Sequence, residues 1–261
     1  MDSILTKIAE ALRVLSPVES RRYFTSAVVL AAGKGERFGQ AQGKKQFVPV
    51  GGIPAVVRSL QTFEKSELIS EVILVTSPTD ICRCEEYRDE YGLTKVKKIL
   101  AGGDDRQASA KIGFDAVDPK SEFIAIHDGA RCLITDALLN STVRAAYKHG
   151  AAVAAEQSRD TVKIATMDEF AEMSPDRSTV WLAKTPQVFM TNMYRAAVYM
   201  ADKDNVRATD DSMLVERLGF KVKMVECGGE NLKITVPMDV KIAEAILRAR
   251  EESDNADRTR I

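Results

Sequence analysis

The sequence has few of the residues that nucleophilic and metal chemistry most often use. Its 261 residues include only two histidines, four cysteines and one tryptophan. The cysteines form neither C-x-x-C pairs nor a dense disulfide framework, and with so few histidines a structural zinc site is not expected; they are Cys82, Cys84, Cys132 and Cys227. We therefore expect reduced thiols and a cytoplasmic protein. No catalytic triad is evident.

A charge bias and long apolar runs are missing as well. The chain has 37 basic and 38 acidic side chains, for a net charge of -1. No whole-chain field favours nucleic acid or an anionic membrane, so we expect neither as a partner, and any anion site must be local. Nothing resembles a membrane span. With 45% hydrophobic and 29% charged residues, the chain has enough apolar material for a core and an ordinary surface.

The two ends differ from the part between them. Near the N-terminus apolar residues recur at helical spacing, interrupted by charges that exclude an export signal; they are Ile4, Leu5, Ile8, Leu12 and Leu15. We expect residues 1–24 to form an amphipathic helical extension. Residues 251–261 are almost entirely polar and are expected to be a frayed tail. The domain should occupy residues 25–250.

Strand and helix patterns alternate through this domain. Short apolar runs predict strands at residues 26–32, 71–76, 96–100, 123–127, 151–155, 187–189 and 221–226. Helices are expected at residues 54–63, 81–91, 106–116, 136–149, 193–201, 211–218 and 240–250. The alternation predicts an α/β fold with a doubly wound, mostly parallel sheet, and ligands bind outside the carboxyl ends of such strands.

The alternation is interrupted at residues 156–184. Two β-rich segments, 161–165 and 179–183, are separated there by a polar stretch that contains proline. A two-stranded ribbon rarely stands alone in water. We therefore expect this β-arm to pack on something, and a second subunit is one candidate.

The loop after the first expected strand is Ala31-Ala-Gly-Lys-Gly-Glu-Arg37. Its glycines allow backbone N–H groups to approach a phosphate chain. Phe38 stands where a dinucleotide fingerprint needs glycine, and Gly43-Lys-Lys45 lacks the Ser or Thr of a P-loop. A plain strand-to-helix turn with surface lysines remains the alternative.

Two further loops also follow strands. Ala101-Gly-Gly-Asp-Asp-Arg-Gln-Ala-Ser109 either forms a turn in which Asp104 caps the next helix or presents backbone groups to a base. His127-Asp-Gly-Ala-Arg131 has an acid beside an arginine, which suits either a salt bridge or a magnesium ligand next to a phosphate clamp. Each loop alone is a weak signal. Three such loops at one edge of the sheet are hard to explain as ordinary turns.

Together these residues carry a family resemblance over residues 25–248. Eight motifs occur in order: Ala31-Ala-Gly-Lys-Gly-Glu-Arg37, Lys45-Gln-Phe47, Gly102-Gly-Asp-Asp-Arg106 with Ser109, His127-Asp-Gly-Ala-Arg131, Asp160-Thr-Val-Lys163, Thr185-Pro-Gln187, Thr209-Asp-Asp-Ser212 and Asn231-Leu-Lys-Ile-Thr235. They resemble the 2-C-methyl-D-erythritol 4-phosphate cytidylyltransferases of the non-mevalonate isoprenoid pathway. The resemblance implies a Rossmann-like nucleotidyltransferase fold.

The resemblance also implies roles for single residues. Arg37 and Lys45 take the catalytic positions. The residues expected to bind CTP are Ala31, Ala32, Gly33, Gly35, Gly102, Gly103, Asp104 and Ser109. The residues expected to bind the sugar-phosphate acceptor are Asp128, Arg131, Thr161, Arg177 and Lys233. The implied cofactor is Mg²⁺, with Asp128 as its protein contact. A homodimer is implied in which the arm, about residues 156–184, reaches the neighbouring subunit.

This chain departs from the family pattern at three places. Lys44 and Cys132 stand where the family usually has proline, and Glu156-Gln-Ser-Arg159 replaces a Pro-Val-type stretch. These changes affect loop rigidity more than charge, and no catalytic group is lost.

The implied reaction suits the composition. A phosphate monoester is already an oxygen nucleophile near neutral pH, because its second pKa is about 6. Neither a Ser or Cys nucleophile nor an obligatory base is needed. Three alternatives stay open: a ribitol 5-phosphate cytidylyltransferase, a nicotinamide oxidoreductase and a catalytically silent nucleotide-binding protein. Ala32 argues against the first, whose family usually has glycine there, Phe38 against the second, and the pair Arg37 and Lys45 against the third.

Overall fold

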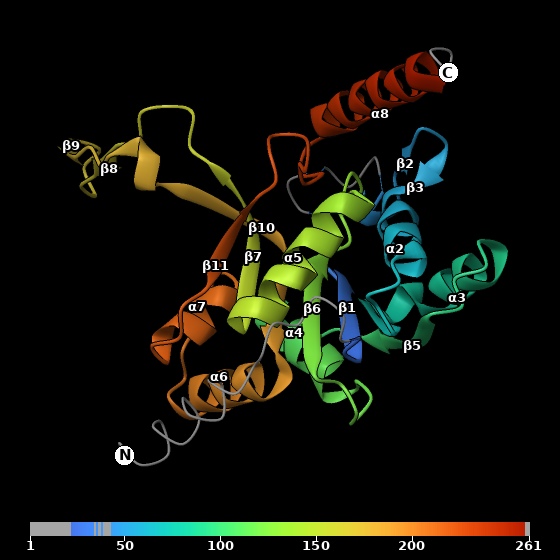
Figure 1. The fold of residues 1–261 in the computed structure, drawn as a ribbon, viewed down its shortest axis with the longest axis horizontal. Helices are drawn as coiled ribbons and strands as arrows, with labels where there is room; N and C mark the ends of the chain where they lie inside the picture. The colour runs from blue at the N-terminus through green and yellow to red at the C-terminus, as the bar shows by residue number, and fades with distance from the viewer. Residues whose placement is uncertain (1–21, 34, 36–37, 39–42, 259–261) are drawn as a thin grey trace.

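The computed structural model describes residues 22–33, 35, 38 and 43–258. A twisted sheet lies in the middle of the molecule with helices on both faces, and a narrow arm projects from one side (Figure 1). Most of the expected N-terminal extension, residues 1–21, lies outside the described residues. The expected α/β fold with a mostly parallel sheet is confirmed.

The central sheet has seven strands in the order β11-β7-β10-β6-β1-β4-β5. Its strands are β1 (Thr25–Ala31), β4 (Glu71–Thr76), β5 (Val96–Ala101), β6 (Phe123–Asp128), β7 (Ala151–Gln157), β10 (Trp181–Met190) and β11 (Lys223–Glu226). Only β10 runs antiparallel to its neighbours in this sheet. All seven residues of β1 are buried, which is why the strand reads as a continuous apolar run rather than an alternating one.

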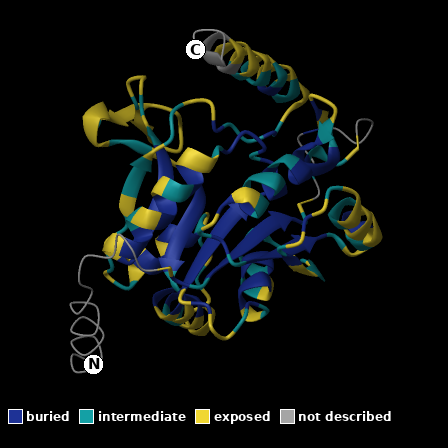
Figure 2. Cartoon of the chain, turned by 45° about the vertical axis from the view of Figure 1, so that its right-hand side comes forward, coloured by how far each residue is buried: buried dark blue, intermediate teal, exposed yellow. Residues whose placement is uncertain are grey.

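Two groups of helices cover the sheet. On one face α2 (Ala55–Lys65), α3 (Ile81–Glu90) and α5 (Asp136–His149) pack over alternate strand residues such as Val29 and Leu74. On the other face α4 (Arg106–Asp115), α6 (Thr191–Lys203) and α7 (Asp211–Arg217) pack over Val28 and Ile73. Figure 2 shows the strands of the central sheet as the most buried part of the molecule.

The bounds of α5 illustrate why the helices lie where the sequence predicts them. Thr135 caps its first turn, with Oγ1 accepting from the amide of Leu138 at 3.2 Å. Gly150 ends it with φ 84°, the left-handed conformation that glycine adopts without steric cost. Strand β7 begins at the next residue.

The arm differs from the expected hairpin. Its ribbon is formed by β8 (Ile164–Ala165) and β9 (Ala171–Met173), followed by the short 3-10 helix η5 (Arg177–Thr179). Residues 181–183, which we expected in the arm, belong to β10 and pair with β7 in the central sheet. The expected β segments were correct only at residues 164–165 and 181–183, and the strand at residues 171–173 was not expected. The pairing was also wrong, because propensity does not specify which strand lies alongside.

The C-terminal helix is also longer than expected. α8 runs from Pro237 to Arg258, so the tail predicted to be frayed is helical up to that residue. Residues 251–258 contain neither glycine nor proline, so nothing stops an established helix from propagating. α8 packs beside the hairpin of β2 (Pro49–Val50) and β3 (Ile53–Pro54). None of the helices in the described ranges is long and apolar enough to cross a membrane.

Candidate active site

A cavity of about 560 Å³ opens at the carboxyl ends of β1, β5 and β6. The chain runs outward from β1 to β4 and β5 and then returns to β6 on the other side of β1, and ligands bind at such switch points. The cavity is lined by Leu30, Ala31, Ala32, Gly33, Gly35, Lys45, Gln46, Gly103, Asp104, Asp105, Arg106, Ser109, Asp128, Ala130, Lys233 and Thr235. Ten of these were expected as site residues.

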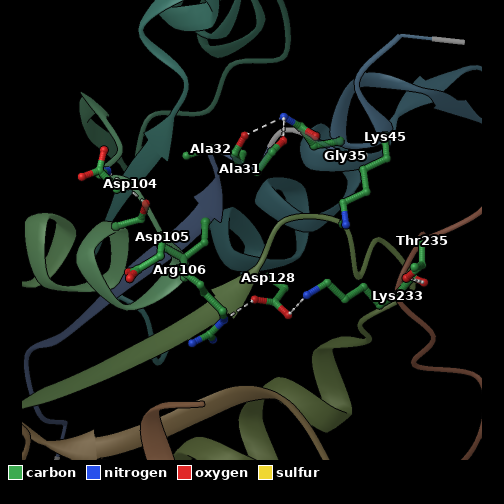
Figure 3. Close-up of a pocket in the computed structure, with 16 residues that line it drawn as sticks. Ala31, Ala32, Gly35, Lys45, Asp104, Asp105, Arg106, Asp128, Lys233 and Thr235 are labelled. Carbon is green, nitrogen blue, oxygen red and sulfur yellow. Dashed lines mark hydrogen bonds and ion pairs between the residues drawn. The ribbon is translucent and has the colours of Figure 1, made fainter. Parts of the chain in front are cut away.

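The first wall is the loop after β1. A Cβ placed on Gly33 would meet nothing within 4 Å, so its backbone borders open space. Gln46 braces the loop from behind, because its amide nitrogen donates to the carbonyls of Ala31 at 2.7 Å and Gly33 at 3.2 Å. Lys45 extends into the cavity beside this loop, next to Gly35 (Figure 3). Arg37, the other expected catalytic residue, lies outside the described residues.

The second wall is the turn after β5. The hydroxyl of Ser109 accepts from the amide of Gly103 at 3.1 Å. A Cβ on Gly102 would lie 2.4 Å from Cβ of Ala32, so the absence of a side chain at Gly102 lets the two loops touch. Asp105 caps α4 by accepting from Ala108 at 2.7 Å, so the alternative in which Asp104 caps this helix is wrong.

Asp128 is the centre of charge at the cavity floor. Nε of Arg106 lies 3.1 Å from Oδ1, and Nζ of Lys233 lies 2.7 Å from Oδ2, so the two cations flank it (Figure 3). Nε of Arg131 is 3.8 Å from Oδ2. Burial alone raises the pKa of Asp128, but the charges of Arg106, Lys233 and Arg131 outweigh it and hold that pKa well below its usual range. The carboxylate is therefore ionised.

Arg106 links Asp128 to a second buried acid. Its Nη1 donates to Oδ2 of Asp211 at 2.7 Å, and Asp211 also accepts from the hydroxyl of Tyr194 at 2.7 Å. Burial lowers the pKa of Arg106, but the charges of Asp211 and Asp128 raise it by more than burial lowers it. The net pKa is therefore above its ordinary value. Arg106 is a permanent cation at the cavity wall.

His127 holds this floor in place from beneath. Nε2 lies 3.3 Å from the carbonyl of Arg131, and Nδ1 lies 3.0 Å from Oγ1 of Thr185. A carbonyl only accepts, so Nε2 carries the proton and Nδ1 accepts from the hydroxyl, which in turn accepts from the amide of Asp128 at 3.0 Å. Burial lowers the pKa of His127 to about 3, so the ring is neutral. It orients the site and is not placed to exchange protons with a ligand.

Two expected acceptor residues lie outside the cavity of this single chain. Thr161 and Arg177 are exposed on the arm, and neither lines the cavity. Nη1 of Arg177 donates to the carbonyl of Arg159 at 3.2 Å. Arg131 does not line the cavity either, although it lies next to Asp128, and it donates to the carbonyl of Asn231 at 2.9 Å.

Comparison with known proteins identifies the family. The sequence model for 2-C-methyl-D-erythritol 4-phosphate cytidylyltransferase matches residues 25–249. The chain belongs to this family. The enzyme of that name from Caldanaerobacter subterraneus subsp. tengcongensis is 40% identical over 224 residues, which cover 85% of this chain and 98% of the relative. The enzyme from Syntrophus aciditrophicus is 38% identical over 226 residues, or 86% of this chain and 96% of the relative.

Solved structures agree with the assignment. The 4-diphosphocytidyl-2C-methyl-D-erythritol synthase from Anaerococcus prevotii superposes with a TM-score of 0.79 at 31% identity, covering 89% of this chain and 100% of that one. The cytidylyltransferase from Thermus thermophilus gives 0.69 at 29% identity, covering 86% and 99%. Membership of this family makes the chain a nucleotidyltransferase, as the resemblance implied.

Sequence reasoning overlooked several residues that form the site. Gln46 and Arg106 stood inside two of the recognised motifs, so a signal for them was present. Asp211 also stood inside a recognised motif, Thr209-Asp-Asp-Ser212, but no role was expected for it. Asp210 does cap α7, accepting from Met213 at 3.0 Å, but Asp211 is buried against Arg106. Nothing in the local sequence indicated that ion pair.

Proposed function

We propose that this chain transfers the cytidylyl group of CTP to the phosphate of 2-C-methyl-D-erythritol 4-phosphate and releases pyrophosphate. The observation that carries the proposal is the composition of the cavity. The backbone at Gly33, which has no side chain, the cation Lys45 and the Asp128–Lys233 pair all line the cavity. Open backbone amides and fixed cations are what a triphosphate and a sugar phosphate both need.

The proposed step needs positioning and charge neutralisation more than proton transfer. An oxygen of the acceptor phosphate attacks the α-phosphorus of CTP. The bond from that phosphorus to the bridging oxygen of the β-phosphate breaks, and its electron pair leaves with pyrophosphate. The acceptor is largely a dianion near neutral pH, so no base must remove a proton. This accords with the neutral, buried state of His127.

Lys45 is the described residue that we assign to the developing charge. Its side chain enters the cavity beside the loop at Gly35 (Figure 3). A fixed cation next to the α-phosphate and the leaving group stabilises the transition state more than the ground state. Arg37 is proposed for the same task.

Cytosine is proposed to lie between the loop after β1 and the turn after β5. Gly103, Asp104 and Ser109 line that side of the cavity. Backbone groups there would select the pyrimidine, because a wrong base leaves them unpaired at a cost of about 1–3 kcal/mol each. Gly102 contributes by its small size, since a side chain at this position would separate the loops.

Magnesium is the proposed cofactor, and the donor set suits an ion held mostly by substrate. No group of three or more His, Cys, Asp and Glu residues in the described ranges could hold a metal alone. Mg²⁺ commonly binds through one or two carboxylates together with substrate phosphates. Asp128 is ionised, and its two oxygens retain acceptor capacity beyond the bonds from Arg106 and Lys233. The ion would neutralise triphosphate charge.

A homodimer is proposed from the surface of the arm. Five large apolar side chains are exposed there or at its base: Ile164, Met167, Phe170, Met173 and Leu182. The ribbon of β8 and β9 is too short to bury them, and it projects away from the body (Figure 1). A second copy that covers this surface would bring Thr161 and Arg177 to its partner's acceptor site.

We also propose a cytoplasmic location, supported by four free cysteines.

Pyrophosphate release is the test of this function. The chain is incubated with Mg²⁺, CTP and either 2-C-methyl-D-erythritol 4-phosphate or ribitol 5-phosphate, with ATP, GTP and UTP in parallel. We expect release with CTP and the first acceptor only. Faster release with ribitol 5-phosphate would move the chain to the alternative acceptor, and no release with either would contradict the proposal. Chelation of the metal should stop the reaction reversibly.

A further inference from the structure

Lys44 is tied to a second loop at the carboxyl edge of the sheet. Its ammonium group donates to Oγ of Ser77 at 3.1 Å and to Oγ1 of Thr79 at 3.0 Å, and it forms an ion pair with Asp80. These partners lie at the 3-10 helix η4 (Pro78–Asp80), between β4 and α3. All three ammonium hydrogens therefore have acceptors.

This is not the environment of a solvated surface lysine. The side chain of Asp80 is only 9% exposed and that of Lys44 is 33% exposed, so the pair is partly shielded from water and salt. Asp80 is also fixed through its backbone, because its amide donates to the carbonyl of Ser77 at 2.9 Å. The carboxylate that accepts from Lys44 thus belongs to a residue whose backbone is held in place.

The residues that follow Lys44 form the cavity wall. The 3-10 helix η3 (Lys45–Phe47) begins directly after it, and the carbonyl of Lys44 accepts from the amide of Phe47 at 2.9 Å. Gln46 contacts the loop after β1, as described above. Lys44 has φ -80° and ψ 125°, which is extended backbone. The side chain of Lys44 reaches η4, whereas that of Lys45 reaches the cavity.

We propose that Lys44 is a positioning residue whose tether to Ser77, Thr79 and Asp80 fixes the backbone of η3 and thereby aims Lys45 into the cavity. This inference rests on the proposed function of Lys45. A misplacement of about 1 Å in a catalytic group can lower the rate on the order of 100-fold. The tether acts on one end of η3 and Gln46 on the middle, so its loss should displace Lys45 without removing the fold.

The geometry provides a rescue variant. Proline fixes φ near -65°, close to the φ of Lys44, so proline fits this backbone. The preceding residue, Gly43, has no Cβ to clash with the proline ring. Lys44→Pro removes the tether but restricts the same dihedral, whereas Lys44→Met removes the tether and leaves the backbone unrestricted.

The first measurement is kinetic. Lys44→Met should lower kcat about tenfold and change KM for CTP less than threefold, because transition-state contacts depend most on geometry. Lys44→Pro should recover most of kcat. In a Lys45→Ala background, Lys44→Met should have no further effect. Lys111→Met, which breaks an exposed ion pair with Asp115 on α4, is the matched control and should match the wild type.

The second measurement does not depend on activity. Hydrogen exchange at the amide of Phe47 should be faster in Lys44→Met than in the wild type and slower again in Lys44→Pro. Unchanged exchange and unchanged kcat in a folded Lys44→Met variant would overturn the inference, as would an additive loss in the Lys45→Ala background. A wild-type chain without pyrophosphate release would contradict the proposed function instead, and exchange at Phe47 alone would then decide whether the tether orders η3.

Discussion

Arg106 and Asp211, 105 residues apart in the chain, form a 2.7 Å ion pair beside the cavity. The side chain of Asp211 is 1% exposed, and the same guanidinium also holds Asp128. One cation thus neutralises two buried carboxylates that belong to different elements. This arrangement stabilises the fold and shapes the site at once.

Replacing that cation should be costly. Arg106→Gln leaves two buried acids short of a counter-charge, and breaking a buried pair typically costs about 3–5 kcal/mol. Arg217→Gln, which breaks a surface pair with Asp204, is the matched control and should cost less than about 1 kcal/mol. Urea unfolding of both variants measures the difference. Equal effects would contradict a special role for Arg106.

Lys45 should matter for the rate more than for binding. Lys45→Ala is expected to lower kcat by about 10²–10³-fold, equivalent to about 3–4 kcal/mol by analogy with oxyanion-hole donors. Arg37→Ala should behave similarly. Calorimetric CTP binding should change far less, and exposed Lys65→Ala should change neither quantity. A kcat near that of the wild type would remove the residue concerned from the catalytic role.

Gly33 allows a cleaner test of the proposed CTP site than Gly103. A Cβ at Gly103 would lie 2.7 Å from Cβ of Ala108, so Gly103→Val would disturb the fold as well as the site. A Cβ at Gly33 meets nothing within 4 Å. Gly33→Ala should therefore keep the Tm of the wild type while its methyl group weakens CTP binding about tenfold or more. Unchanged CTP affinity by calorimetry would mean that the triphosphate lies elsewhere.

Stability should fall below pH 6.5 because of His127. Its pKa is about 3 in the folded chain and about 6.5 in the unfolded chain, so the unfolded state binds more protons between these values. Stability is therefore lost as the pH falls, by up to about 1.4 kcal/mol for each unit within this window.

Asp128 acts in the same direction at lower pH. Its depressed pKa contributes stability that is lost as the pH falls below the ordinary carboxyl range. The interval from pH 6.5 to 4.5 therefore separates the contribution of His127 from that of Asp128. His127→Gln should flatten the pH dependence of the unfolding free energy there. His149→Gln should flatten it less, because His149 is exposed and its pKa is lowered only by slight burial and by the nearby charges of Lys148 and Lys223. An unchanged slope in His127→Gln would show that other groups titrate.

The proposed exchange of arms predicts complementation between inactive subunits. Arg177→Ala and Lys45→Ala dimers should each be nearly inactive. Random subunit exchange yields mixed dimers with one site that has both wild-type groups, so about one quarter of wild-type activity should return. Mass spectrometry of the mixture verifies the exchange. No recovery despite exchange, or a fully active monomer by light scattering, would contradict the arrangement in trans.

Much of the fold and site followed from local sequence. The strand at residues 71–76 and the helix at residues 136–149 lie within the predicted bounds, because buried parallel strands are continuous apolar runs and because Thr135 and Gly150 end the helix by local chemistry. The order of the three loops placed Gly33, Ser109 and Asp128 at one sheet edge, since parallel strands share the direction of their carboxyl ends.

Tertiary structure decided what depends on partners distant in sequence. Residues 181–183 joined β10 rather than the arm, because strand pairing depends on which neighbour has free backbone groups alongside. Arg106 became part of the site because folding brought it to Asp128 and Asp211, and Lys44 became a tether because η4 lies next to it. Local pattern specifies periodicity and turns, whereas a charge pair forms only where the packed elements bring its two side chains together.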